Sequence, residues 1–462
     1  MRDPGAAMFD FARELRRLFG SEASRPFTDG LTGGDAGLME LLDLRLLTQE
    51  GKSADVAAGR ISARDKAQRR LEAAVVWREA ARRSGDAVML RKAAATAEIA
   101  AAAFDRNRRP DGWARARCEQ AFCAMLGAEL FGDEGLNAAA ETAFREARAA
   151  ARGGLVAPLA DVGIAAIEAR RRLADGDAQA ARVCAARFTA PIAALDALTR
   201  RCSTARLLAA EARLVRADLL AGWGARLKDA DLIQAAFDEA AAVVDHLDPT
   251  YEPLTWARAQ MMRGTALILL GEVVGEMDAL SSAVAGLADV LDQLTRDHSP
   301  LDWARVQVAL AQGLQALGDA SANERAYEQA VTCYDRANMV LKNAPSVTLR
   351  GAAAGARAVC LARSAELTGD VAVLDSAVAA MKMELAVLPA RRDPLGWALA
   401  QLQLARLYEA RVDITGKDRG ERLSAITALD AALDVFSERG LRSLSIVAVD
   451  AMERLRGASS PV

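Results

Sequence analysis

The sequence predicts an all-α fold: an α-solenoid (a right-handed superhelix) of about eight antiparallel helix pairs, closed by a C-terminal capping helix. Three observations predict it. A tryptophan-containing phrase returns along the 462-residue chain, a small–large–small pattern returns at steps of 47 to 49 residues, and the composition is apolar but poor in aromatic residues. A fixed period of roughly 20 to 50 residues is typical of stacked repeats.

The recurring phrase is clearest at Ser299–Asp319, which reads SPLDWARVQVALAQGLQALGD. Close copies begin at Glu252 and Asp393, and a more divergent copy begins at Arg109. Their tryptophans are Trp113, Trp256, Trp303 and Trp397. The separations of 143, 47 and 94 residues are close to three, one and two units of 47. The phrase therefore marks a period and not a single site, and we expect its tryptophans to be packing residues.

A second pattern predicts the second helix of each unit. It places alanine, a large residue and alanine as in Ala330, Tyr334 and Ala337. The last place of this pattern falls at Ala100, Ala147, Ala194, Val243, Val290, Ala337, Glu384 and Ala432. This register predicts eight helix pairs over residues 61–439. We expect Pro191 to kink or shorten the second helix of the third unit.

Proline and glycine predict where the first helices begin and end. A proline stands three residues before each tryptophan, where its ring suits the first helical turn. These prolines are Pro110, Pro253, Pro300 and Pro394. Ser299 and Asp393 precede two of them and can cap. Gly271, Gly318 and Gly369 are predicted to end first helices.

The chain outside the repeat is predicted to form an N-terminal docking segment and two caps. Residues 1–35 contain a short amphipathic helix followed by a flexible, glycine-rich tether. Its apolar face carries Met8, Phe11, Leu15, Leu18 and Phe19. This helix could dock on a partner, lie on a membrane, enter the protein's own groove or cover the first repeat. Residues 36–60 are predicted as a cap with a helix at Leu38–Gln49, and residues 440–462 as a capping helix, Ser443–Leu455, and a disordered tail.

Composition agrees with closely stacked helices. Apolar residues make up 52% of the chain and aromatic residues 5%, with abundant alanine, so we expect almost no strand. The net charge of −3 is too small to indicate a nucleic-acid partner. The charge is uneven, because residues 60–92 carry ten Lys/Arg and four Asp/Glu, whereas residues 229–298 carry three and thirteen. We expect these faces to be mostly solvated.

The cysteines and the N-terminus predict a cytoplasmic protein. Six cysteines stand at positions 118, 123, 184, 202, 333 and 360. They form no Cys-x-x-Cys pair, so we expect small buried hydrophobes in a reducing compartment. The N-terminal stretch lacks the apolar run of a signal peptide. No run of about 18 apolar residues predicts a membrane span.

The first helices carry a small residue that is followed three positions later by a large one. Arg263-Gly264 with Leu267, Leu310-Ala311 with Leu314, and Leu404-Ala405 with Tyr408 fill these places. With the small–large–small pattern of the second helices, the chain resembles the tetratricopeptide repeat (TPR) family, in its long bacterial form with a period of about 47 residues. The resemblance covers about four fifths of the chain. It implies a concave groove, lined mainly by first helices, in which partners bind.

The register of this resemblance places a set of side chains in the groove. Arg115, Arg258 and Arg305 occupy equivalent places, two residues after a tryptophan. The other members of the set are Phe122, Met125, Arg172, Arg216, Met261, Thr265, Val308, Gln312, Gln315, Leu402 and Arg406. Arginines beside apolar side chains would bind a helix or an extended peptide with acidic residues and an apolar stripe. Alternatively, the arginines pair with acidic residues on adjacent helices and stabilise the stack.

Signals of catalysis are absent from the sequence. His246 and His298 are the only histidines, and without paired cysteines they cannot complete the usual zinc sites. Neither lies near an obvious nucleophile. Thr415-Gly416-Lys417 lacks the earlier glycine of a phosphate-binding loop. We therefore expect no catalytic residue, no metal site and no cofactor, and we do not expect an enzyme.

The sequence thus predicts a cytoplasmic adaptor or scaffold that holds a protein or peptide partner, such as an acidic amphipathic segment, in its concave groove. One alternative is a ligand- or peptide-controlled regulator gated by the N-terminal helix. Another is a membrane- or pole-targeting module in which that helix contacts a membrane. Deletion of residues 1–35 would separate these functions. The sequence does not decide the oligomeric state, because an uncapped apolar end could pair two arrays into a homo-oligomer.

Overall fold

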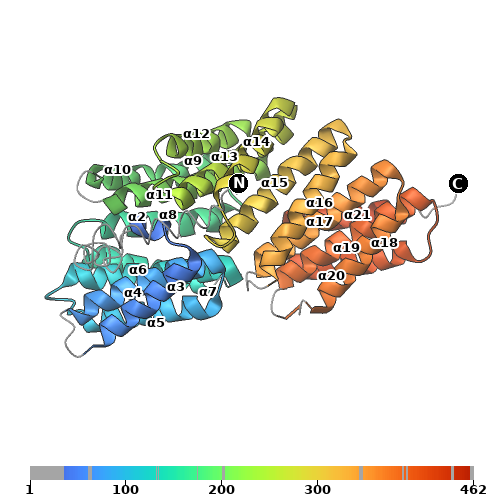
Figure 1. The fold of residues 1–462 in the computed structure, drawn as a ribbon. Helices are drawn as coiled ribbons and strands as arrows, with labels where there is room; N and C mark the ends of the chain where they lie inside the picture. The colour runs from blue at the N-terminus through green and yellow to red at the C-terminus, as the bar shows by residue number, and fades with distance from the viewer. Residues whose placement is uncertain are drawn as a thin grey trace.

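The computed structural model describes residues 36–60, 65–131, 133, 135–173, 175–199, 203–342, 347–387, 390–391, 394–438 and 442–457. Throughout these residues the regular structure is helical and includes no strand. The predicted docking helix with Met8, Phe11, Leu15, Leu18 and Phe19, and the tether after it, lie outside the described residues. The predicted all-α solenoid is confirmed (Figure 1).

The described helices form eight consecutive pairs and a final single helix, as predicted. The first four pairs are α4 (Lys66–Ser84) with α5 (Ala87–Ala103), α6 (Pro110–Phe131) with α7 (Gly135–Ala150), α8 (Val156–Leu173) with α9 (Ala178–Ala186) and α10 (Thr189–Leu198), and α11 (Ser203–Leu227) with α12 (Ala230–Asp245). The next four are α13 (Pro253–Leu270) with α14 (Met277–Gln293), α15 (Pro300–Ser321) with α16 (Glu324–Leu341), α17 (Val347–Thr368) with α18 (Val371–Val387), and α19 (Pro394–Thr415) with α20 (Glu421–Glu438). The single helix α21 (Arg442–Gly457) packs on α20.

The N-terminal cap differs from its prediction as one helix over Leu38–Gln49. The chain forms two helices there, α2 (Ala36–Glu40) and α3 (Leu44–Gly59). Asp43 separates them, because its carboxylate caps α3 by accepting a 2.7 Å hydrogen bond from the Leu46 amide. The break lets α3 pack on α4 while α2 turns toward α11 and α13.

Most of the predicted helix boundaries are confirmed. The four prolines begin α6, α13, α15 and α19, and the second helix of the third unit is split into α9 and α10, with Pro191 in the first turn of α10. Gly369 follows α17 in a left-handed conformation. The prediction for Gly318 was wrong: α15 continues to Ser321, and Ala322 takes the left-handed place. A short π-helical turn, Gly271–Gly275, follows α13.

Small residues permit the close helix crossings, as predicted. A Cβ atom on Gly264 would lie 2.8 Å from the Leu287 side chain on α14. Ala311 and Ala337 are completely buried in the same core. Trp256 is buried as well, and Trp303 packs against that core. These tryptophans are therefore packing residues.

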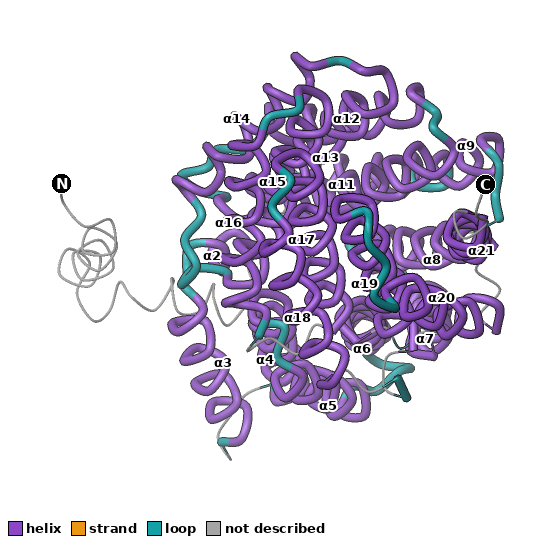
Figure 2. Tube along the Cα trace, turned by 90° about the vertical axis from the view of Figure 1, so that its right-hand side faces the viewer, coloured by secondary structure: helices purple, strands orange, loops and turns teal. Residues whose placement is uncertain are grey.

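The array curls until distant units meet. Helix α4 of the first unit contacts α15 of the sixth, and α6 contacts α17. One apolar core runs from Met39 to Cys360. In the view turned by 90°, the pairs curl around instead of forming a straight row (Figure 2). First helices therefore face each other across the inside of the superhelix, and the expected open groove is partly enclosed.

Candidate functional site

A cavity of about 630 Å³, open to solvent beside Asp111 and Arg152, lies where the first helices of the N-terminal half converge. Its walls come from α4, α6, α8 and α11, with contributions from α2 and α13. The apolar part of the wall includes Val75, Phe122, Leu155, Leu159, Leu207 and Leu208. The volume lies in the range of pockets that enclose a small ligand. The cavity therefore suits a short segment and not a folded domain.

Ion pairs between neighbouring first helices hold one side of this cavity. Arg78 of α4 pairs with Glu119 of α6, and Arg82 of α4 pairs with Glu211 of α11. Both carboxylates line the cavity, so their charges are compensated by arginines of the wall itself. This side fixes the spacing of three helices and offers little net charge to a ligand.

Two cavity-lining arginines have no such partner. Arg115 on α6 and Arg152, just before α8, make no ion pair with any residue that the structure describes. The backbone amide of Arg152 donates a 2.8 Å hydrogen bond to Asp111, which anchors this loop to the start of α6. The loop continues through Gly153 and Gly154, where added Cβ atoms would meet no neighbour. Both guanidinium groups are thus available to an anionic ligand beside the apolar wall.

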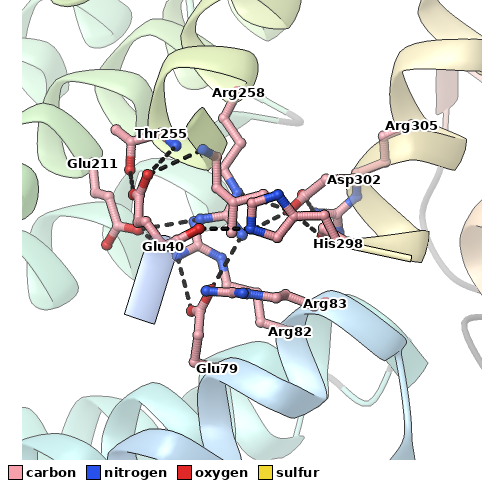
Figure 3. A network of polar contacts seen from close by, with 12 residues as sticks. Glu40, Glu79, Arg82, Arg83, Glu211, Thr255, Arg258, His298, Asp302 and Arg305 are labelled. Carbon is pink, nitrogen blue, oxygen red and sulfur yellow. Dashed lines mark hydrogen bonds and ion pairs between the residues drawn. The ribbon is translucent and has the colours of Figure 1, made fainter. Parts of the chain in front are cut away.

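A buried charge network lies behind the cavity (Figure 3). The guanidinium of Arg258 donates to Asp302 from Nη2 at 2.7 Å and from Nε at 3.1 Å. It also lies 3.6 Å from carboxylate oxygens of Glu79 and of Glu211. Although burial alone would raise the pKa of Asp302, the charge of Arg258 holds that pKa below its ordinary value. Arg305 extends the network by pairing with Glu129 of α6.

Helix α2 enters this network from a distant part of the chain. The Glu40 carboxylate accepts hydrogen bonds from the amides of Leu254 and Thr255, at 3.0 and 3.1 Å, and from the Thr255 hydroxyl. Nε2 of His298 donates to the Glu40 carbonyl oxygen at 2.6 Å. Burial raises the pKa of Glu40, against the opposing effects of the Thr255 hydrogen bond and the Arg258 charge. Burial lowers the pKa of His298 to about 4.

The predicted groove residues have different environments. Arg115, Phe122 and Arg258 line the cavity, but Arg258 is only 8% exposed and is held by carboxylates. The equivalence of Arg115, Arg258 and Arg305 therefore does not extend to their contacts. For Arg258 and Arg305 the structure supports the alternative that these arginines stabilise the stack of helices, since both pair with acidic residues on other helices.

The remaining predicted residues lie outside this cavity. Val308 and Leu402 are buried in apolar cores, and Met125 and Met261 pack partly buried. Arg172 pairs with Glu168, and Arg216 with Glu239. The hydroxyl of Thr265 donates to its own helix, and Gln315 accepts from Tyr334. Gln312 is exposed, and Arg406 is exposed at a second cavity of about 320 Å³ between α17, α19 and α21.

Sequence reasoning missed Glu40, Arg152 and His298. Arg152 stands in a loop, outside the repeated helix places from which the groove was inferred. Glu40 and Thr255 are 215 residues apart, and nothing local in the sequence pairs them. His298 immediately precedes Ser299, the predicted cap of a first helix, and it is only 7% exposed. The sequence feature that could have drawn attention to His298 is its position directly before a predicted helix start.

The described residues contain no group of three or more His, Cys, Asp or Glu side chains that could hold a metal ion. The cysteines among them, Cys118, Cys123, Cys184, Cys333 and Cys360, are free and buried, as expected of small hydrophobes. Burial raises the pKa of the Cys118 and Cys123 thiols far above the ordinary value. None of the described helices combines the length and the apolar character needed to cross a bilayer.

Comparisons with known proteins give only distant structural likenesses. No family model and no curated protein matches the sequence. A Rap protein complexed with competence and sporulation factor is 10% identical, with a TM-score of 0.47, over 86% of this chain and 99% of that chain. A circular tandem repeat protein with novel repeat topology is 15% identical, with a TM-score of 0.25, over 98% of this chain and 94% of that chain. The structure of Naa15/Naa10 bound to HypK-THB is 12% identical, with a TM-score of 0.17, over 97% of this chain and 93% of that chain.

Proposed function

We propose that this chain is a non-enzymatic, TPR-like adaptor that binds a short acidic and partly apolar segment of a partner protein in this cavity. The observation that carries the proposal is the pair of arginines, Arg115 and Arg152, that lie beside an apolar wall and form no ion pair with any described residue. A guanidinium group in a partly desolvated site binds a carboxylate through charge-assisted hydrogen bonds. Phe122, Leu207 and Leu208 would cover apolar side chains of the same segment.

The size of the cavity limits the length of the segment. A volume of about 630 Å³ matches a few residues in extended form. A long amphipathic helix, which the open groove of a loosely coiled array would accept, does not fit between α4, α6 and α11. The partner is therefore recognised through a tail or a loop. The cytoplasmic location predicted from the sequence belongs to the same proposal.

A peptide titration tests this function. The probe is a fluorescein-labelled hexapeptide of alternating glutamate and leucine, and the control peptide replaces each glutamate by lysine. Binding of the acidic peptide alone supports the proposal. The double variant Arg115→Ala/Arg152→Ala should weaken the acidic peptide's affinity by about a hundredfold to ten-thousandfold, since each of the two lost charge-assisted bonds is worth about 1.5 to 3 kcal/mol.

Arg406→Ala is the matched control for that titration. Arg406 is an exposed first-helix arginine, but it lies at the second cavity and not at this one. Its replacement should leave the affinity unchanged. Equal loss of affinity in the Arg406 variant and the double variant, or equal binding of the two peptides, would contradict the proposal.

The enclosure of the cavity also favours the ligand-controlled regulator as a second candidate. Helices α2 and α13 are far apart in the sequence but contact each other, and residues of both line the cavity. A ligand held there would touch two parts of the superhelix at once and alter how strongly they associate. An adaptor and a regulator differ in whether binding changes the shape of the array.

A further inference from the structure

Helix α13 is capped by a residue from another part of the chain. Glu252, which precedes its first residue, makes no side-chain hydrogen bond to the helix. Its carboxylate instead pairs with Arg206. The amides of Leu254 and Thr255 would therefore lack partners, and Glu40 of α2 accepts both. The carboxylate also lies at the positive end of the helix dipole, where a negative charge is stabilising.

Four further hydrogen bonds anchor the same short segment, residues 36–44. His298 donates to the Glu40 carbonyl oxygen, and the Leu44 amide donates to the Asp297 carbonyl oxygen at 3.2 Å. On the opposite side, Arg83 of α4 donates to the carbonyl oxygens of Met39 at 3.0 Å and Leu42 at 2.7 Å. The segment thus joins the first unit to the start of the fifth and to the loop that precedes the sixth.

The contacts of this segment form and break together. Glu40, Thr255, His298 and Arg83 are all buried. A buried donor or acceptor without a partner costs more free energy than a made hydrogen bond contributes. If the segment leaves, the buried α13 amides lose their acceptor and the Arg83 guanidinium loses both carbonyl oxygens, keeping its bond to Glu79. The segment is therefore either engaged or released as a unit.

The same segment forms part of the cavity wall. Met39 and Glu40 line the cavity, together with Glu79, Arg83 and Arg258 of the surrounding network. Figure 3 shows Glu40 between Thr255, His298 and the arginines of α4. Release of the segment removes one wall of the cavity and breaks its hydrogen bonds to the start of the fifth unit and to the loop before the sixth.

We propose that residues 36–44 are a latch that holds the superhelical turn closed around the cavity. Engagement adds to the direct contacts of α4 with α15 and of Glu79 with Arg258; release widens the cavity at its α2 wall. The link to a ligand rests on the proposed function: a segment bound in the cavity contacts the engaged latch and stabilises it. By linkage, the latch then increases the affinity for that segment by the same factor.

Hydrogen exchange of the full chain without ligand tests the latch itself. The variant Glu40→Ala removes the cap of α13, so the Leu254 and Thr255 amides should exchange about tenfold faster. Small-angle X-ray scattering should show a larger radius of gyration at an unchanged helical circular dichroism signal. Glu50→Ala is the control, because Glu50 is a half-buried glutamate of the adjacent helix α3 that makes no hydrogen bond or ion pair with α13 among the described residues.

The outcomes separate a latch from a static cap. Faster exchange with expansion in Glu40→Ala, and in Glu40→Ala alone, supports the latch. Unchanged exchange, faster exchange at an unchanged radius of gyration, or equal changes in the Glu50 variant overturns it. If Glu40→Ala loses helical signal, Thr255→Val decides by the same comparison, since it removes only the hydroxyl that donates to Glu40.

Adding the glutamate–leucine peptide tests the coupling. Saturating peptide should slow exchange of the Leu254 and Thr255 amides in the unmodified chain, and Glu40→Ala should weaken peptide binding. A peptide that binds without slowing this exchange overturns the coupling. Failure of the peptide to bind contradicts the proposed function, and the comparison of the unliganded variants then decides the latch by itself.

Discussion

At the residue scale, the environment of each arginine decides what it does. Arg115 and Arg258 stand at equivalent places of the repeat, two residues after a tryptophan. Arg258 faces Asp302, Glu79 and Glu211 and is buried. Arg115 lines a cavity without an ion-pair partner among the described residues. The repeat predicts where an arginine lies along a helix, whereas its partners depend on which distant unit packs opposite.

Replacing Arg258 by alanine should destabilise the fold. The change leaves Asp302 buried without its strongest partner, and breaking a buried ion pair costs about 3 to 5 kcal/mol. We expect the midpoint of thermal unfolding to fall clearly. Arg406→Ala, at an exposed position, should leave the midpoint almost unchanged. Equal midpoints for the two variants would mean that the buried network contributes little.

Stability should depend on pH through His298. The unfolded chain takes up this proton near the ordinary pKa of 6.5, whereas the folded chain takes it up only near about 4. The folded state therefore loses stability as the pH falls from 6.5 through 4, by up to about 3 kcal/mol.

Chemical unfolding between pH 7 and pH 4 measures this effect. His298→Gln should flatten the pH dependence in that window. His246→Gln, which changes the exposed histidine at the end of α12, should retain it. A pH profile that is the same in both variants would assign the dependence to other groups.

At the element scale, helix crossings depend on the absence of single methyl groups. Gly264 of α13 and Gly286 of α14 both lie inside helices, but their surroundings differ. A Cβ at position 264 meets Leu287 at 2.8 Å, while a Cβ at position 286 meets nothing within 4 Å. The two positions form a matched pair for the same substitution.

Gly264→Ala should destabilise the array by about 1 to 3 kcal/mol, because the added methyl group overpacks the crossing. Gly286→Ala should stabilise it by about 0.5 to 1 kcal/mol, since alanine has the better helix propensity and space is free. Denaturant midpoints measure both. A destabilised Gly286 variant, or a stabilised Gly264 variant, would show that the helices cross differently.

Elements were predictable where their signal was local and repeated. The proline, tryptophan and alanine places predicted eight pairs, and the structure has them in that order. The break between α2 and α3 was missed, because Leu41, Leu42 and Leu46 continue an apolar helical spacing through it. Only the Asp43 cap and the packing of α2 on distant helices separate the two. Tertiary contacts therefore overrode the local pattern.

At the scale of the whole molecule, closure of the superhelix determines the site. Small rotations between successive units add up along an array, and here they bring α4 against α15 and α6 against α17. No local pattern predicts that sum. The sequence therefore located Arg115 and Phe122 on the inner face, but it predicted an open groove where the structure has a cavity. Glu40 can contact α13 and His298 only because the superhelical turn closes and brings α2 against the fifth and sixth units.

The central claim is that an acidic segment binds inside this closed turn, and photo-crosslinking tests it most directly. The glutamate–leucine peptide would carry a benzoylphenylalanine in place of one leucine, and mass spectrometry would map the modified residues. The account predicts crosslinks to the cavity wall around Phe122, Leu207 and Leu208, which the lysine–leucine peptide does not form. Crosslinks confined to the outer helices, such as α5, α7 and α12, would contradict it.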